Sequence, residues 1–120
     1  MRMTSAGALG SFGLEEVQEP LLNALKDQHA GVRAAASRSL GEAVNSHSDR
    51  DAVQTIVAAL IVALKDQDEN VRVQTAWALG AIGPQARNAI SALVQLADDP
   101  SPSVKQTSAA SLAHIQETRQ

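Results

Sequence analysis

The sequence has 120 residues, a formal net charge of −3 at pH 7, no cysteine, and only 2% aromatic residues. This length allows one domain with a modest core of Ala, Leu, Val and Ile, a composition that argues against an all-β fold. The lack of cysteine excludes disulfides, zinc–thiolate sites and a thiol nucleophile, and it fits a reducing compartment such as the cytoplasm. The negative net charge disfavours nucleic acid as a partner.

The first predicted element is a helix over residues 1–13, MRMTSAGALGSFG, and its pattern returns three times along the chain. The later copies read VRAAASRSLGEAV at 32–44, VRVQTAWALGAIG at 71–83 and VKQTSAASLAHI at 104–115. Each copy opens with a hydrophobic residue and a basic residue, and carries Leu at its ninth position. In the copy at 71–83, Val71, Ala76, Leu79 and Ile82 fall at helical spacing on one stripe. The pattern therefore predicts an amphipathic helix in every copy.

A second segment precedes each of the last three copies: PLLNALKD at 20–27, LIVALKD at 60–66 and LVQLADD at 93–99. Each unit thus reads as two helices joined by a short turn. We expect one domain over 1–120, made of a half repeat at 1–13 and helix pairs at 14–44, 48–83 and 84–116, or about seven helices in three and a half repeats.

Local signals place the ends of these helices. Ser48 followed by Asp51 is a variant of the capping box and predicts a helix start. Gly83 and Pro84 predict a sharp break, with Pro at the first position of the next helix. The DPSPS segment at 99–103 predicts a turn that admits no helix.

The motif VRxxAAxALGxIG, which 71–83 matches almost residue for residue, resembles the second helix of HEAT repeats, especially the short bacterial kind found in phycobilisome lyase subunits. The resemblance covers nearly the whole chain and implies an all-α superhelix, a HEAT-like α-solenoid whose second helices line the concave face. It also implies a ladder of ion pairs and turn hydrogen bonds between neighbouring repeats. The recurrent charged residues assigned to that ladder are Asp27, Arg33, Asp66, Arg72, Asp98 and Lys105.

Residues at the third, fourth, seventh and eleventh motif positions are expected to point away from the core, Ala34 and Ala35 among them. Trp77, the one tryptophan of the sequence, occupies such a position, and Trp is enriched at binding hot spots. The alternative is that Trp77 folds over Val73 and fills a shallow gap. The partner-binding candidates on the concave face are Trp77, Val73, Gln74, Arg38, Glu42 and His114.

Two apolar surfaces predict self-association. The helix at 1–12 has no polar cap, so its side chains Met1, Leu9 and Phe12 are expected to dock on a second copy or on further sequence. The segment IVAALIVAL at 56–64 is apolar all round, which predicts that Val57, Val62 or both meet something beyond their own repeat. The alternative is that these residues are tolerated on the convex face. This run is about half of what a membrane-spanning helix needs.

We expect no catalytic, cofactor or metal site, because the three histidines have no partner at ligand spacing and no nucleophile or phosphate-binding motif occurs. The leading hypothesis is a protein–protein interaction scaffold that binds its partner on the concave face and could self-associate. The alternatives are a non-catalytic subunit or chaperone of a lyase-type enzyme that handles bilins, and a nucleic-acid binder.

Overall fold

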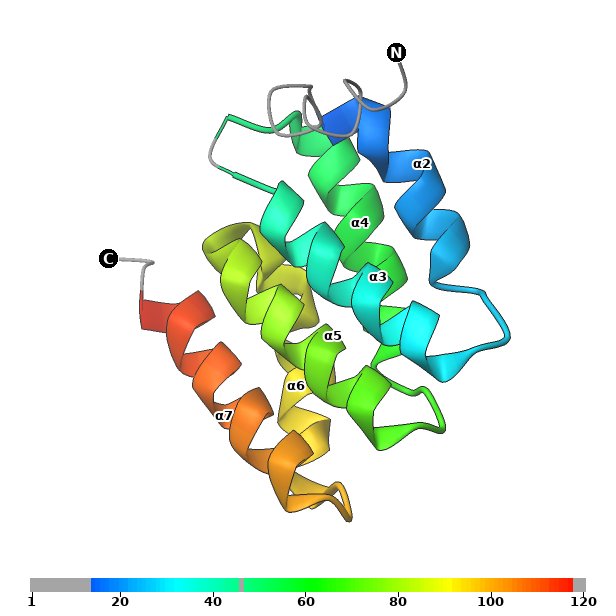
Figure 1. Ribbon diagram of the computed structural model, residues 1–120. Coiled ribbons are helices and arrows are strands. Elements are labelled where there is room, and N and C mark those ends of the chain that lie inside the picture. The colour runs from blue at the N-terminus through cyan, green and yellow to red at the C-terminus, as the bar shows by residue number, and fades with distance from the viewer. Residues whose placement is uncertain (1–13, 46, 118–120) are drawn as a thin grey trace.

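The computed structural model describes residues 14–45 and 47–117, and this part of the chain is all-α (Figure 1). Its α-helices are α2 (Leu14–Ala24), α3 (Ala30–Ala43), α4 (Arg50–Ala63), α5 (Glu69–Ile82), α6 (Ile90–Gln95) and α7 (Pro102–Glu117). Two 3-10 segments, η2 (Gly83–Ala89) and η3 (Leu96–Asp98), flank α6. The expected total of seven helices is not supported, and the half repeat assigned to 1–13 lies outside the described residues.

The helices form two layers. Helices α3, α5 and α7, which carry the repeated motif, lie side by side toward the viewer in Figure 1, with α4 and α6 behind them. The contacts between α3 and α5 and between α5 and α7 are the most extensive in the described fold. The repeat pattern therefore places the second helix of every unit in a single layer.

Small residues set the spacing within that layer. A Cβ added to Gly41 would lie 2.6 Å from the Cα of Ala78, and one added to Gly80 would lie 2.5 Å from the Oγ of Ser111. Both distances are shorter than real contacts of a Cβ atom, so neither site admits a side chain without moving the next helix. The recurring Gly of the motif is thus required by the close approach of neighbouring second helices.

The core lies between the layers and includes the fully buried Leu40, Ile56, Leu60 and Leu79. Val57 belongs to it as well, with 1% of its surface exposed, so the prediction that Val57 takes part in self-association is wrong. The buried positions of α4 follow helical spacing toward the second-helix layer, and Val57 falls among them. Val62 lies on the opposite side of α4 and is 72% exposed.

Several helix ends differ from the sequence-based prediction. Helix α4 is capped by Asp49, which accepts a hydrogen bond from the backbone N–H of Ala52 at 3.0 Å, and not by Ser48. Helix α7 begins at Pro102, inside the segment expected to admit no helix, because the side chain of Ser101 accepts from the N–H of Val104 and proline suits the first helical position.

The first half of the last helix pair is irregular. The predicted helix after Gly83 is divided into η2, α6 and η3, and Gly83 itself has a φ of 78°, which favours glycine. None of the helices in the described part of the chain is both long and apolar enough to span a bilayer.

Candidate partner-binding face

Charged residues at the turns link successive repeats. Arg33 of α3 donates from Nε and Nη2 to the carboxylate of Asp66 at 2.7 and 3.0 Å, and from Nη1 to the backbone carbonyl of Asp27 at 2.8 Å. Arg72 of α5 repeats this pattern, with the carboxylate of Asp99 and the carbonyl of Asp66 as acceptors. Each arginine therefore joins its own turn to the turn of the next repeat.

The acid that pairs with Arg72 is Asp99, so the choice of Asp98 for this role is wrong. Asp98 is exposed at the end of η3, whereas 6% of the Asp99 side chain is exposed. Counting back five positions from the first valine of each second helix gives Asp27, Asp66 and Asp99. Counting from the second helix thus identifies the equivalent acid in all three turns, whereas counting from the first helix leads to Asp98. Lys105, the remaining residue assigned to the ladder, is exposed on α7.

The three turn carboxylates share one local geometry. Each accepts a hydrogen bond from the backbone N–H two residues later, that of His29, Asp68 or Ser101, at 2.8–2.9 Å. These bonds and the arginines stabilise the charged form. The pKa of Asp27 is lowered mainly by its bond from His29, and that of Asp66 mainly by Arg33. Burial would raise the pKa of Asp99, but the hydrogen bonds from Arg72 and Ser101 outweigh it and lower the pKa.

Four of the predicted partner-binding residues come together on α3 and α5. The guanidinium of Arg38 lies 4.4 Å from the centroid of the Trp77 ring, at the distance of a cation–π contact. Arg38 also donates to Glu42 at 3.3 Å and to Gln74 at 3.4 Å. The ring of Trp77 is half-buried and packs partly against the core. Because Glu42 neutralises Arg38, this cluster adds little net positive charge to the face.

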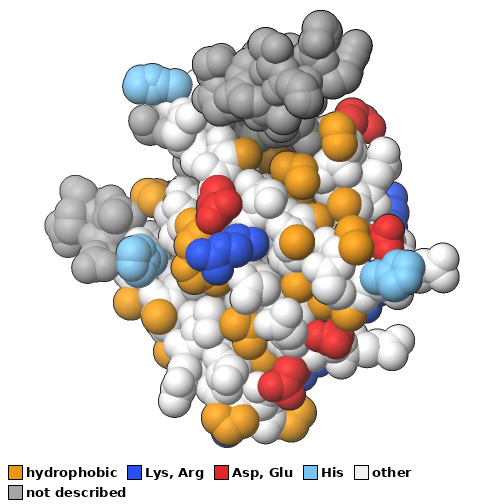
Figure 2. All heavy atoms as spheres, viewed as in Figure 1, with side chains coloured by type: hydrophobic (Ala, Val, Ile, Leu, Met, Phe, Trp, Pro, Cys, Tyr) orange, Lys and Arg blue, Asp and Glu red, His pale blue; other side chains and the backbone are white. Residues whose placement is uncertain are grey.

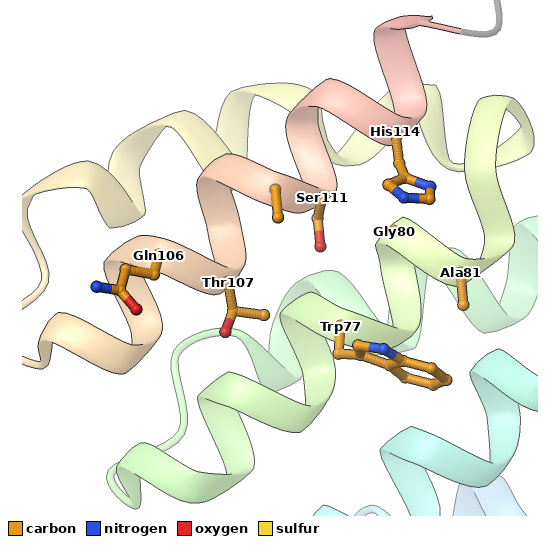
Figure 3. Close-up of a pocket in the computed structure, with 8 residues that line it drawn as sticks. Trp77, Gly80, Ala81, Gln106, Thr107, Ser111 and His114 are labelled. Atoms are coloured by element: carbon orange, nitrogen blue, oxygen red, sulfur yellow. The ribbon is translucent and has the colours of Figure 1, made fainter.

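A groove lies next to Trp77, between α5 and α7, with a volume of about 540 Å³ and a mostly apolar lining. Figure 3 shows Trp77 and Ala81 on its α5 side and Gln106, Thr107, Ser111 and His114 on its α7 side. The indole of Trp77 extends from α5 toward α3, while the imidazole of His114 points toward α5. Trp77 thus contacts Arg38 on one side and borders the groove on the other.

We use the term second-helix face for the exposed surface of α3, α5 and α7. Figure 2 views the molecule from this side and shows hydrophobic side chains spread in small groups, with charged side chains sparse among them. Val73 and Gln74 are half-buried here. Ala34, expected to point outward, is instead 4% exposed, because it precedes Ser37 by one helical turn on the flank that packs against α5.

Within the described residues, no three His, Asp or Glu side chains gather closely enough to hold a metal ion. The candidate residues Met1, Leu9 and Phe12 lie outside the described part of the chain. Arg38 contacts Trp77, and Trp77 borders the groove, so these features form one continuous candidate surface for a partner.

Comparison with protein-family models gives three matches. The model for HEAT repeats matches residues 57–120, and that for a HEAT-like repeat matches residues 30–82. The model for the PBS lyase HEAT-like repeat matches residues 1–27. No curated protein matches the sequence.

Proposed function

Because this chain belongs to the HEAT-repeat family, we propose that its second-helix face binds a protein partner in the groove between α5 and α7. Repeats of this family generally act as protein-interaction scaffolds and are typically non-catalytic. The observation that carries the proposal is the apolar groove beside the Trp77–Arg38 stack. A half-buried tryptophan, held by a cation and bordering a hollow, has the features of a binding hot spot.

The chemistry of the face indicates what such a partner offers. The groove is lined mainly by apolar surface, and the charge of Arg38 is already balanced by Glu42. We therefore expect a peptide segment that inserts small apolar side chains between the helices and lays an apolar or aromatic group on the indole of Trp77. A strongly acidic or basic partner would find little complementary charge here.

The test compares captured proteins for matched pairs of variants. Ala110 lines the groove, whereas its neighbour Ala109 is exposed on α7 but does not line it. Ala110→Arg should fill the groove and abolish capture of the partner from a lysate of the native host, and Ala109→Arg should leave capture intact. Trp77→Ala should also lose the partner, and Val94→Ala, at an exposed valine of α6, should keep it.

The one tryptophan of the sequence provides a direct readout. A captured partner, once purified, should change the emission of Trp77 on titration, and Ala110→Arg should remove that change. Unaltered capture by Ala110→Arg and Trp77→Ala, with unchanged helical circular dichroism, would show that the partner binds elsewhere.

The match of residues 1–27 to the PBS lyase HEAT-like repeat supports a second candidate, a non-catalytic subunit or chaperone that handles bilins. A bilin would stack on Trp77 and take polar contacts from Arg38, Glu42 and Gln74, which lie together. Mixing purified protein with a bilin should then shift the visible absorbance of the pigment and quench Trp77. An unchanged spectrum would dismiss this candidate and leave the protein-partner proposal untouched.

A further inference from the structure

The surface of α4 that faces away from the core carries a regular stripe. Its members are Asp51, Thr55, Ala58 and Val62 of α4 together with Lys65, which lies just past the helix end, and all five are exposed. Their spacing alternates between four and three residues, the pattern by which one helix packs along another in a coiled coil. Val62, with 72% of its surface exposed, is the most exposed of the large hydrophobic residues in the described part of the chain.

This stripe is close to its own complement when read in the opposite direction. Asp51 lies seven residues before Ala58 and Lys65 lies seven after it, while Thr55 and Val62 lie three before and four after. Two copies of α4 laid antiparallel about Ala58 therefore place Asp51 beside Lys65, and they bring Thr55 and Val62 close together with an offset of one residue, about 1.5 Å along the axis. Ala58 then meets its counterpart on the two-fold axis, where its small side chain lets the helices approach closely.

The two charges are available for such a contact. Among the described residues, neither Asp51 nor Lys65 forms an ion pair, whereas the neighbouring Asp66 is already held by Arg33. Asp51 lies in the first turn of α4 and Lys65 just past its end, so each charge also suits the dipole of its own helix. A second copy would satisfy both charges at once.

A hollow of about 580 Å³ with mostly apolar walls adjoins the stripe, between α2 and α4. Thr55 and Val62 border it on α4, and Leu22 of α2 and Leu25 in the turn after α2 border it on the other side. An α4 helix from a second copy, lying along the stripe, would cover part of this hollow and extend the apolar contact to α2. The exposed apolar surface on this side is thus wider than one helix.

We infer that the chain forms a homodimer through antiparallel packing of α4 on the α4 of a second copy, centred near Ala58. The contact lies on the side of α4 opposite the core, away from the second-helix face, and so does not depend on the proposed partner groove. A dimer of this kind carries two grooves, and a partner with two binding segments gains affinity from bivalent attachment.

The first test measures the oligomeric state by analytical ultracentrifugation over a range of protein concentrations. The parent protein should dimerise, and Val62→Glu should be monomeric at concentrations where the parent is a dimer. The matched control is Val94→Glu, at another exposed valine, which lies on α6 and should leave the dimer intact. A parent that stays monomeric at millimolar concentration, or a Val62→Glu variant that still dimerises, would overturn the inference.

Charge exchange tests the pairing of Asp51 with Lys65. Lys65→Asp places two acids together at both ends of the interface and should raise the dissociation constant roughly tenfold. Asp51→Lys should do the same, and the double variant Asp51→Lys/Lys65→Asp should return the dissociation constant to near the parent value. A double variant as weak as either single variant would refute this pairing.

Disulfide trapping tests the register, and the absence of native cysteine makes it clean. Under oxidation, Ala58→Cys should give a covalent dimer, because the two thiols meet on the axis. Val62→Cys should not, since the two copies of residue 62 are about 12 Å apart along the helix axis. Efficient trapping of Val62→Cys as well as Ala58→Cys would indicate parallel helices, and a failure of Ala58→Cys to be trapped would contradict the proposed geometry.

Discussion

Arg72 and Asp99 form a two-bond ion pair between α5 and the turn before α7, with Nε–Oδ2 and Nη2–Oδ1 distances of 2.8 and 3.1 Å. Both side chains are largely buried, so breaking the pair would leave a charge poorly solvated. Asp99→Ala should therefore lower the free energy of unfolding by about 1–3 kcal/mol in urea denaturation. The adjacent Asp98→Ala removes an exposed carboxylate and should change it by less than about 0.5 kcal/mol. Equal effects of the two changes would contradict the assignment of Asp99.

The lowered pKa values of Asp66 and Asp99 make the fold sensitive to acid. A carboxylate with a lowered folded pKa contributes stability that is present above its unfolded pKa of about 3.9 and is lost as the pH falls through the folded value. Urea midpoints should therefore stay nearly constant from pH 7 to about pH 5 and fall steeply below about pH 4. The double variant Asp66→Asn/Asp99→Asn should be less stable at pH 7, and its urea midpoint should fall less steeply as the pH is lowered.

Two hydroxyl groups bond to each other between α3 and α5, but at the matching positions between α5 and α7 only one of the two hydroxyls is present. Ser37 of α3 bonds to Thr75 of α5 at 2.8 Å, and Thr75 donates to the carbonyl of Val71. Ser108 of α7 corresponds to Thr75, but the residue of α5 that corresponds to Ser37 is Ala76. The Oγ of Ser108 is consequently buried, and no group in the described part of the chain forms a hydrogen bond with it.

Removing that hydroxyl should help the fold. Ser108→Ala is expected to raise the free energy of unfolding by on the order of 1 kcal/mol, because an unsatisfied buried polar group is destabilising. The contrasting change is Ser111→Ala, which removes a bond of 2.6 Å to the carbonyl of Ala76 and should lower stability by a similar amount. Thermal denaturation of both variants measures this, and a loss of stability in Ser108→Ala would show that its hydroxyl is satisfied.

Two glycines of α3 should respond in opposite directions to alanine. Gly41→Ala forces the new methyl group against the backbone of Ala78, and overpacking of this kind costs about 1–3 kcal/mol. Gly31→Ala meets nothing within 4 Å and should stabilise the protein by up to about 1 kcal/mol through helix propensity. Melting temperatures of the two variants decide between a packing role for Gly41 and a purely local one.

Repetition made the architecture readable, because four copies of one pattern constrain each other's helical register. The copies predicted the all-α fold, and the outward positions they assigned to Trp77, Arg38 and Gln74 do lie on the second-helix face. The prediction was least accurate where a single copy departs from the pattern. Asp98 was chosen over Asp99 because the turn before α7 carries one extra residue relative to the first helix.

Burial around the two valines of α4 shows a second limit. The run at 56–64 has no polar face, so helical spacing alone could not tell which of Val57 and Val62 faces the core. Packing of α4 against the second-helix layer decides this, burying Val57 and leaving Val62 exposed. In the last helix pair, the first helix is divided into η2, α6 and η3. The sequence did not predict this division, because a hydrophobic pattern does not distinguish 3-10 turns from α-helical turns.

The sequence by itself determined the helical class, the repeat and the family, since these follow from local helix propensity and from the period of its apolar residues. Only the tertiary structure decided which arginine pairs with which aspartate, which valine is buried and where Arg38 meets Trp77. These relations join residues 27 to 39 positions apart, and they depend on how closely Gly41 and Gly80 let neighbouring helices pack. Distances between helices are set by side-chain volumes on both partners, and no single segment encodes them.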